Sequence, residues 1–337
     1  MRNAVKTKSF KSRLINASLV VLSIAILLVT VEGLSYLVLK VSDEGYYRPD
    51  FKNSLGLRDP REPHQLRNKQ VVLAIGDSFT HGLGVPYQNS YPAQLEANLQ
   101  SVYSDVAVVN AGIPGLETNM ALNLLKRVYD DYEPKLVILG FHSGDVVQNL
   151  QIVDDGINST VMDDKNFKEI IRHSEEHLPK LFLLKEFLRQ KTSTFALVNY
   201  LYKNYIIKYL PPPAEMTSLG AGNDFQATEY LLDKMHEFLS SRNTKLVILS
   251  IVPLVRFDAY PYNLLNERLE KYAQSRNVDF INPLKEFSKH SSSELWVSIR
   301  DGHYNAEGNR VISEAVMAYL IKHNLLADAH PIARRLE

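Results

Sequence analysis

Short apolar segments alternate with amphipathic segments between residues 71 and 323, and this alternation constrains the fold more than any other feature of the chain. The apolar segments are residues 71–75, 105–110, 135–141, 245–251 and 278–281. The segments at 91–100, 117–132, 261–276 and 305–323 have apolar residues at helical spacing. Continuous apolar strands that alternate with such helices predict a parallel sheet covered on both faces.

The preference for right-handed crossovers favours a flavodoxin-like, three-layer α/β/α arrangement with a five-stranded parallel sheet. Residues 151–225 interrupt the alternation with helical patterns and no strand pattern, so we expect a helical insertion that covers the carboxyl edge of the sheet. Its tyrosine-rich stretch, 195–213, ends at three prolines. Two interpretations stay open for this stretch: a packed helix, and a cap that lies on a membrane surface.

The N-terminus predicts a membrane anchor. Residues 1–13 contain five basic residues and no acidic residue, and in residues 14–39 the only charge is Glu32. About 20 apolar residues suffice to cross a bilayer, and the basic flank predicts a cytoplasmic N-terminus with the rest exported. A cleaved signal peptide and a buried core helix fit less well, because the run is long and apolar on all faces. We expect 40–69 to be an extended tether, 70–325 the folded domain and 326–337 a tail.

Composition excludes several classes of function. The 337-residue chain has a net charge of zero, which gives no indication of a nucleic-acid partner, and it contains no cysteine, which excludes disulfides and thiolate metal sites. His173 and His177 match a zinc-protease pattern, but no third ligand is evident, so we expect no metal and no cofactor. An Asn-Ser-Thr glycosylation pattern stands at 158–160.

Polar groups follow the predicted strands at the edge where parallel sheets bind ligands. The first strand runs into "GDSFTHG" (76–82), the second into "NAGIPG" (110–115) and the third into "FHSGD" (141–145). Ser78 is either a helix N-cap or a nucleophile. Asp301 and His303, two residues apart before the last helix, have the spacing for a carboxylate to orient an imidazole base.

These motifs resemble those of the SGNH (GDSL-type) hydrolases, and the membrane helix and tether resemble those of exported bacterial members. The resemblance implies Ser78 as nucleophile, His303 as base and Asp301 as its orienting carboxylate. It also implies that the backbone N–H groups of Ser78 and Gly112 stabilise an oxyanion. The other residues expected in the oxyanion site or the pocket are Asp77, His81, Asn110, His142, Ser143 and Gly144.

The third motif departs from the family pattern. Aligning Asp145 with the family's aspartate puts Gly144 where the family has an asparagine that donates to the oxyanion. Removing one such donor typically costs roughly 3–4 kcal/mol of transition-state stabilisation. Ser143 and His142 are the nearby side chains expected to substitute for it.

The sequence thus predicts a membrane-anchored, extracytoplasmic serine esterase that acts on carboxylic esters, O-acetyl esters among them, through an acyl-enzyme. Two alternatives stay open: an O-acyltransferase that passes the acyl group to a cell-surface polysaccharide, and a catalytically degenerate carbohydrate-binding or scaffold protein. The expected partners are an ester or acylated-sugar substrate and the membrane, through one N-terminal helix. The sequence identifies no protein partner.

Overall fold

Five parallel strands form a sheet in the order β2-β1-β3-β4-β5 in the computed structural model, which describes residues 2–42, 52–146, 192–206, 210–212, 214–221 and 224–332. The strands are β1 (Gln70–Gly76), β2 (Val106–Gly112), β3 (Leu136–Phe141), β4 (Lys245–Ser250) and β5 (Asp279–Ile281). This flavodoxin-like order confirms the predicted fold class, and the strand boundaries lie within one or two residues of those expected.

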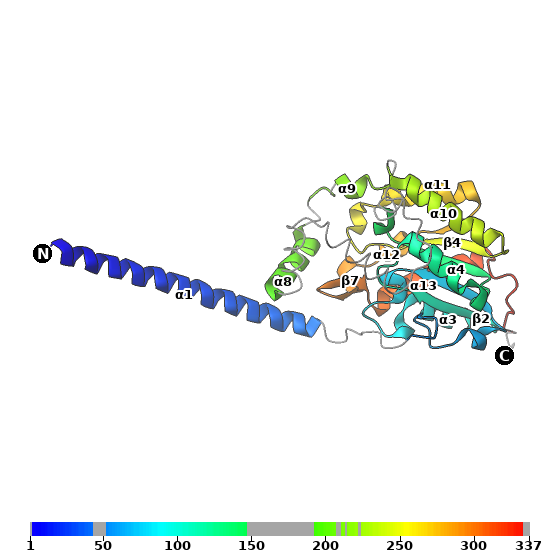
Figure 1. Ribbon diagram of the computed structural model, residues 1–337, viewed down its shortest axis with the longest axis horizontal. Helices are drawn as coiled ribbons and strands as arrows, with labels where there is room; N and C mark the ends of the chain where they lie inside the picture. The colour runs from blue at the N-terminus through cyan, green and yellow to red at the C-terminus, as the bar shows by residue number, and fades with distance from the viewer. Residues whose placement is uncertain are drawn as a thin grey trace.

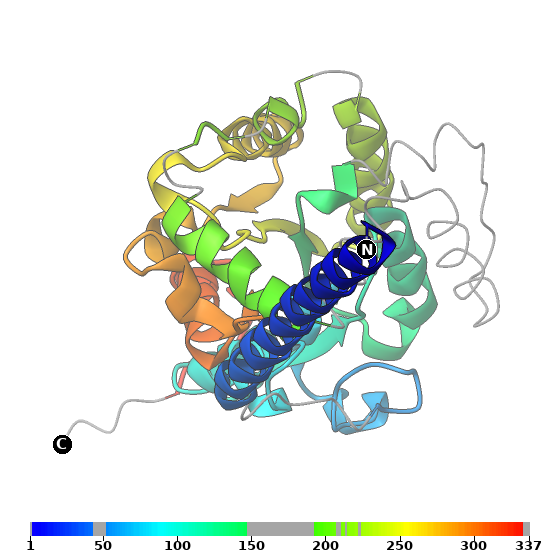
Figure 2. The same cartoon turned by 90° about the vertical axis from the view of Figure 1, so that its left-hand side faces the viewer.

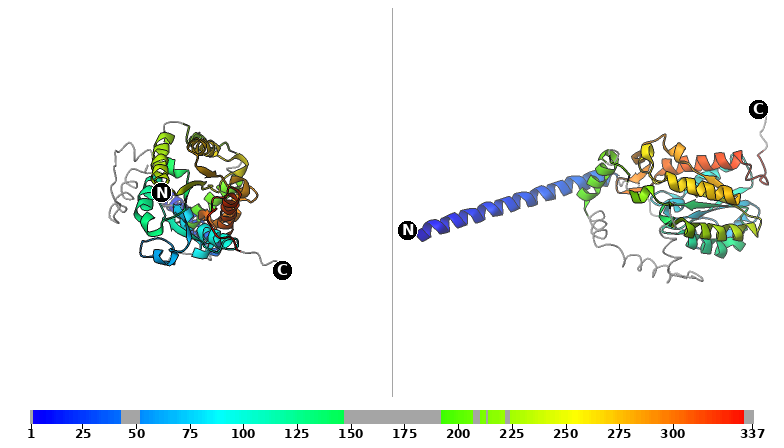
Figure 3. Two further views of the ribbon diagram at one scale, coloured as in Figure 1. Left: turned by 90° about the vertical axis from the view of Figure 1, so that its right-hand side faces the viewer. Right: turned by 90° about the horizontal axis from the view of Figure 1, so that it is seen from above.

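Helices cover both faces of this sheet (Figures 1 and 3). Alternate residues of β1 divide between two cores: Leu73 and Ile75 face one, whereas Val72 and Ala74 face the other. The first core is closed by α4 (Thr118–Tyr132), α10 (Asp224–Ser240) and α11 (Asn263–Arg276), and the second by α3 (Tyr91–Leu99) and α13 (Ala306–Lys322). Both faces are therefore buried, as the continuous apolar strands require.

Smaller elements complete the domain. An antiparallel hairpin joins β6 (Trp296–Ser298) to β7 (Asp301–Tyr304), and two short helices, α2 (Ser78–His81) and α12 (Leu284–Phe287), follow β1 and β5. The 3₁₀ helices in the described part of the chain are η1 (Pro63–Leu66), η2 (Tyr87–Asn89), η5 (Phe257–Ala259) and η6 (Ser292–Leu295). The hairpin was not expected from the sequence, and it carries both Asp301 and His303.

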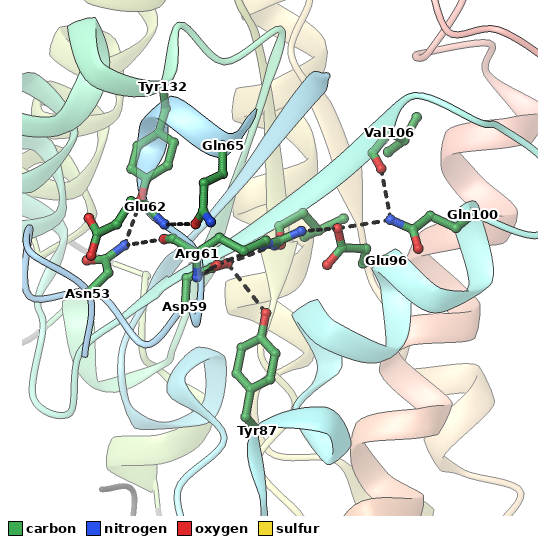
Figure 4. Close-up of polar contacts among 11 residues, drawn as sticks. Asn53, Asp59, Arg61, Glu62, Gln65, Tyr87, Glu96, Gln100, Val106 and Tyr132 are labelled. Carbon is green, nitrogen blue, oxygen red and sulfur yellow. Dashed lines mark hydrogen bonds and ion pairs between the residues drawn. The ribbon is translucent and has the colours of Figure 1, made fainter. Parts of the chain in front are cut away.

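Residues 52–69 are not an extended tether but part of the domain (Figure 4). Leu57 is fully buried in the core beside α4. Arg61 forms ion pairs with Asp59 (2.9 Å) and with Glu96 of α3 (2.5 Å), and it donates to the carbonyl of Val108 in β2 (3.0 Å). The polar, proline-containing composition of this stretch predicted a solvated tether, but its long-range contacts fix it on the edge of the sheet.

The C-terminal residues also belong to the domain up to Ile332. His330 contacts Asp105 (Nδ1 to Oδ2, 2.5 Å), and the Ile332 N–H donates to the carbonyl of Val102 (2.8 Å). The expected tail is therefore folded over 326–332. Residues 333–337 lie outside the described part of the chain.

A single helix, α1 (Arg2–Ser42), projects from the domain (Figures 1 and 2). It begins well before the expected Leu14, so the basic segment continues the helix. Within it, Ser18–Lys40 is long and apolar enough to cross a membrane or to act as a signal sequence. Where its side chains are described, most are exposed large hydrophobics between Leu19 and Val38.

The insertion is described only in part. It includes α8 (Ser193–Leu201), the π-helical turn η3 (Tyr202–Ile206) and α9 (Ala214–Thr217). Helix α8 contacts α1 (Figure 1). The histidines at 173 and 177 and the glycosylation pattern at 158–160 lie outside the described residues.

Candidate active site

Ser78 is the first residue of α2, and only Asp77 separates it from the end of β1 at Gly76. The side chain of Asp77 caps this helix by accepting from the Phe79 N–H (2.9 Å). The turn into α2 is tight: a Cβ added at Gly76 would lie 2.4 Å from Thr80 Oγ1. The glycine and the aspartate thus set a sharp strand-to-helix turn that presents Ser78 at the carboxyl edge of the sheet.

A chain of contacts joins Ser78 to His303 and Asp301. Ser78 Oγ lies 2.7 Å from His303 Nε2, and His303 Nδ1 lies 2.5 Å from Asp301 Oδ1. The same carboxylate accepts from the His303 N–H (3.0 Å), which fixes the side chain against its own strand. The ring of Phe79 packs on the His303 ring at 4.6 Å between centroids. The three residues predicted to form a triad therefore lie in the hydrogen-bonded order that a nucleophile, base and orienting carboxylate need.

The backbone N–H of Gly112 is directed elsewhere than expected. It donates to Asn110 Oδ1 (3.0 Å), and a Cβ at Gly112 would lie 2.1 Å from the backbone nitrogen of His81. Gly112 is thus the point where β2 presses against α2, and its N–H is occupied, contrary to the expectation that it donates to an oxyanion. Asn110 is fully buried and stabilises this packing instead of lining an open pocket.

Gly115 lies three residues after Gly112, and its backbone N–H is the one that fits the role of oxyanion donor expected of Gly112. Its φ is 77°, it is exposed, and a Cβ there would meet nothing within 4 Å. Among the described residues, no group accepts from its backbone N–H. The sequence offered a signal, since "NAGIPG" contains two glycines, but spacing alone does not say which of them adopts a left-handed backbone.

His81 does not line the pocket. It is 6% exposed and its Nδ1 contacts the carbonyl of Gly112 (2.8 Å). Burial lowers the pKa of His81 to about 4, so the ring is neutral at neutral pH and donates to that carbonyl. The expectation that it faces the substrate is corrected: it joins the end of α2 to the end of β2.

The loop after β3 forms a compact turn. The Gly144 N–H donates to His142 Nδ1 (3.1 Å), and the His142 N–H donates to Asp145 Oδ2 (3.2 Å). Because Nδ1 accepts, the proton of the neutral ring is on Nε2. The His142 ring stacks on Phe79 at 5.3 Å, on the residue that also contacts His303. Ser143 is buried and bonded to the Tyr262 hydroxyl, so it is turned toward α11.

Burial suppresses charge around this loop. It lowers the pKa of His142, and it raises the pKa of Asp145 well above its usual range, with the nearby Asp77 acting in the same direction. Within the described ranges, no three His, Asp or Glu side chains gather as a metal site would require.

A hydrogen-bonded Ser–His–Asp triad at the carboxyl edge of a parallel sheet is the arrangement of serine hydrolases. This protein belongs to the GDSL-like lipase/acylhydrolase family, whose model matches residues 74–311. This match confirms the resemblance inferred from the sequence motifs.

Individual relatives match more weakly. An arylesterase of Vibrio mimicus is 32% identical over 76 residues, which are 23% of this chain and 38% of that enzyme. The crystal structure of TesA is 14% identical with a TM-score of 0.44 and covers 74% of this chain and 98% of its own. An acetylxylan esterase from Geobacillus stearothermophilus is 14% identical with a TM-score of 0.41, covering 74% of this chain and 93% of its own.

Proposed function

We propose that this protein is a serine esterase that cleaves carboxylic esters, O-acetyl esters among them, through a covalent acyl-enzyme. The contact that carries the proposal is the 2.7 Å between Ser78 Oγ and His303 Nε2, with Asp301 on the opposite nitrogen. A degenerate binding module has no need to keep these three groups in hydrogen-bonded order. The family membership supports the same conclusion.

The reaction follows from these contacts. Ser78 Oγ attacks the ester carbonyl carbon while His303 Nε2 takes its proton, and Asp301 stabilises the imidazolium that forms. The tetrahedral intermediate collapses as His303 returns the proton to the departing alkoxide oxygen, which leaves an acyl-Ser78. Water then attacks this ester, again giving a proton to His303, and the acid departs as Ser78 regains its hydrogen.

The oxyanion has two backbone donors in this proposal. The Ser78 N–H is at the start of α2, where no helical partner precedes it, and Gly115 supplies the second N–H from the loop after β2. His142 Nε2–H supplies a third donor in place of the asparagine that Gly144 replaces. The neutral ring and its fixed tautomer suit it to donate.

The domain is proposed to lie outside the cytoplasm, held by α1. The support is the apolar helix Ser18–Lys40 and the basic residues that precede it. A reporter enzyme that is active only outside the cytoplasm, fused after residue 337, is expected to be active. A stable but inactive fusion contradicts this orientation, and a mature chain that begins after residue 35 contradicts the anchor.

Labelling with a fluorophosphonate probe tests the esterase proposal. The detergent-solubilised full chain is expected to be labelled at Ser78 and to hydrolyse p-nitrophenyl acetate, and Ser78→Ala is expected to lose both properties. Ser101→Ala, at an exposed serine after α3, is the matched control and should retain both. Unchanged labelling or hydrolysis in Ser78→Ala contradicts the assignment.

A further inference from the structure

Glu32, the only charged residue among residues 14–39, has its partners on the insertion. Its carboxylate accepts from the backbone N–H groups of Ser193 (2.5 Å) and Thr194 (3.0 Å), the first two residues of α8. Helix N-termini carry partial positive charge, so a carboxylate there is stabilised. Acidic residues inside membrane-spanning segments need such partners. Helix α8 therefore docks onto α1 at the level of Glu32.

Near Glu32, one side of α1 is buried and the other sides are exposed and apolar. Ser35 and Leu39 follow Glu32 at helical spacing and are buried, at 4% and 0% exposed, and Ser35 Oγ accepts from Thr194 Oγ1 (3.3 Å). The remaining sides of α1 at the same level are apolar and exposed. The exposed residues there are Leu34, Tyr36, Leu37 and Val38. The side that does not touch α8 is thus continuous with the apolar surface of Ser18–Lys40.

Helix α8 and η3 also present apolar side chains to the outside. Five large apolar or aromatic residues in this stretch are at least 39% exposed. They are Val198, Leu201, Tyr202, Tyr205 and Ile206. A surface of this kind on a domain in water is a mark of an interaction site, and tyrosines are enriched where proteins meet the bilayer interface.

Helix α8 also contacts the catalytic hairpin, which is formed by β6 and β7. Ser193 Oγ accepts from Arg300 Nη2 (3.0 Å), and Arg300 directly precedes Asp301. The ring of Tyr200 packs edge-on against Trp296 of β6 at 5.8 Å. Figure 1 shows α8 and β7 together at the end of the domain that faces α1. Helix α8 thus lies between the apolar helix and the hairpin that carries His303.

We propose that α8 and η3 insert their apolar face into the interface of the phospholipid bilayer beside α1, so that the Ser78 edge of the domain faces the lipid surface. The inference rests on the proposed membrane-spanning role of α1. A lipid occupant is favoured over a protein because α8 is docked on α1 through Glu32, beside the exposed apolar surface of Ser18–Lys40. The substrate ester would then be presented at the membrane surface.

Depth-dependent quenching in vesicles tests this placement, and the absence of cysteine from the chain makes single labels straightforward. Tyr205→Cys and Tyr230→Cys form a matched pair, because the two tyrosines are 59% and 56% exposed on η3 and on α10. Leu27→Cys reports on α1 itself. Each full-length variant carries an NBD fluorophore in vesicles of phosphatidylethanolamine and phosphatidylglycerol that contain brominated lipids, and its thermal midpoint checks that the domain is folded.

We expect bromolipids to quench the labels at 205 and 27 strongly and the label at 230 weakly. A label at 205 that behaves like the one at 230, while 27 is quenched, overturns the inference and leaves the anchor intact. Labels that all escape quenching overturn the anchor and the inference together. Val198→Cys replaces Tyr205→Cys if the latter lowers the thermal midpoint, and the same outcomes apply to it.

Discussion

The backbone N–H of Gly112 donates to the side chain of Asn110 over 3.0 Å, two residues back along β2. This contact takes Gly112 out of the set of oxyanion donors and makes Asn110 a structural residue. Asn110 Nδ2 also reaches the carbonyl of His81 (3.3 Å), so one buried amide joins the end of β2 to the end of α2. The geometry of the Ser78 turn therefore depends on a side chain that does not touch Ser78.

Asn110→Ala is expected to destabilise the domain. It leaves the buried Gly112 N–H without its acceptor, which costs about 1–3 kcal/mol, whereas the His81 carbonyl keeps its bond from Arg58 (2.6 Å). The thermal midpoint of the detergent-solubilised protein measures this loss, and hydrolysis well below that midpoint should persist at a reduced rate. A variant with an unchanged midpoint and abolished hydrolysis would show instead that Asn110 acts in the chemistry.

Gly115→Ala is expected to lower kcat more than it raises KM. An alanine at φ 77° costs about 1–2 kcal/mol, and relief of that strain turns the N–H away from the oxyanion. Gly56→Ala is the matched control, because Gly56 has φ 80° and open space around it but lies in the segment before η1. Equal loss of kcat in both variants would attribute the effect to stability and remove Gly115 from the site.

His142→Phe is expected to reduce kcat roughly 10²-fold, the effect of losing one oxyanion donor. The phenyl ring keeps the stacking on Phe79 but has no Nε2–H. His142→Gln retains a donor and should recover part of the rate.

Gly144→Asn, which restores the family asparagine, should leave kcat unchanged if His142 already donates. Gly144 does not have the positive φ that would disfavour asparagine. A gain in kcat from Gly144→Asn with no effect of His142→Phe would reverse the assignment.

Sequence patterns predicted the sheet because its strands are buried on both faces and therefore read as continuous apolar runs. The patterns also predicted that Ser78, Asp301 and His303 lie together at the carboxyl edge of the sheet, because these residues follow a strand end or alternate along an extended segment. The same patterns could not show whether Gly112 or Gly115 supplies the backbone N–H to the oxyanion. It depends on Asn110 folding back onto its own strand, which is a tertiary contact.

The segment before β1 was misjudged for a related reason. Its charges and prolines resemble those of a solvated linker, yet Arg58 and Arg61 find partners far along the chain. The docking of α8 on Glu32 is equally non-local, spanning 161 residues. Local periodicity carries no information about such pairs, so the sequence indicated that Glu32 was unusual without identifying its partner.

Arg58→Met is expected to destabilise the Ser78 turn. The Arg58 guanidinium is buried and donates to three carbonyls, those of His81 (2.6 Å), Gly82 (2.8 Å) and Val85 (2.7 Å). Methionine fills similar space but cannot donate to these carbonyls, and each hydrogen bond from a charged donor contributes about 1.5–3 kcal/mol. The thermal midpoint and kcat should both fall. Arg67→Met, at an exposed position, is the control, and equal behaviour of the two variants would contradict this role.

The stability of the domain is expected to fall between pH 6.5 and about pH 4 because of His81. Burial lowers the pKa of this ring in the folded state from 6.5 to about 4, so in that window the unfolded chain binds a proton that the folded chain does not. The stabilisation is complete above pH 6.5 and declines as the pH falls, by about 3 kcal/mol in total. Thermal midpoints at pH 7 and pH 4 measure it. His81→Gln, which can still donate to the Gly112 carbonyl but does not titrate, should show a smaller drop than the wild type. Equal drops in the two proteins would mean that the acid sensitivity resides in other groups.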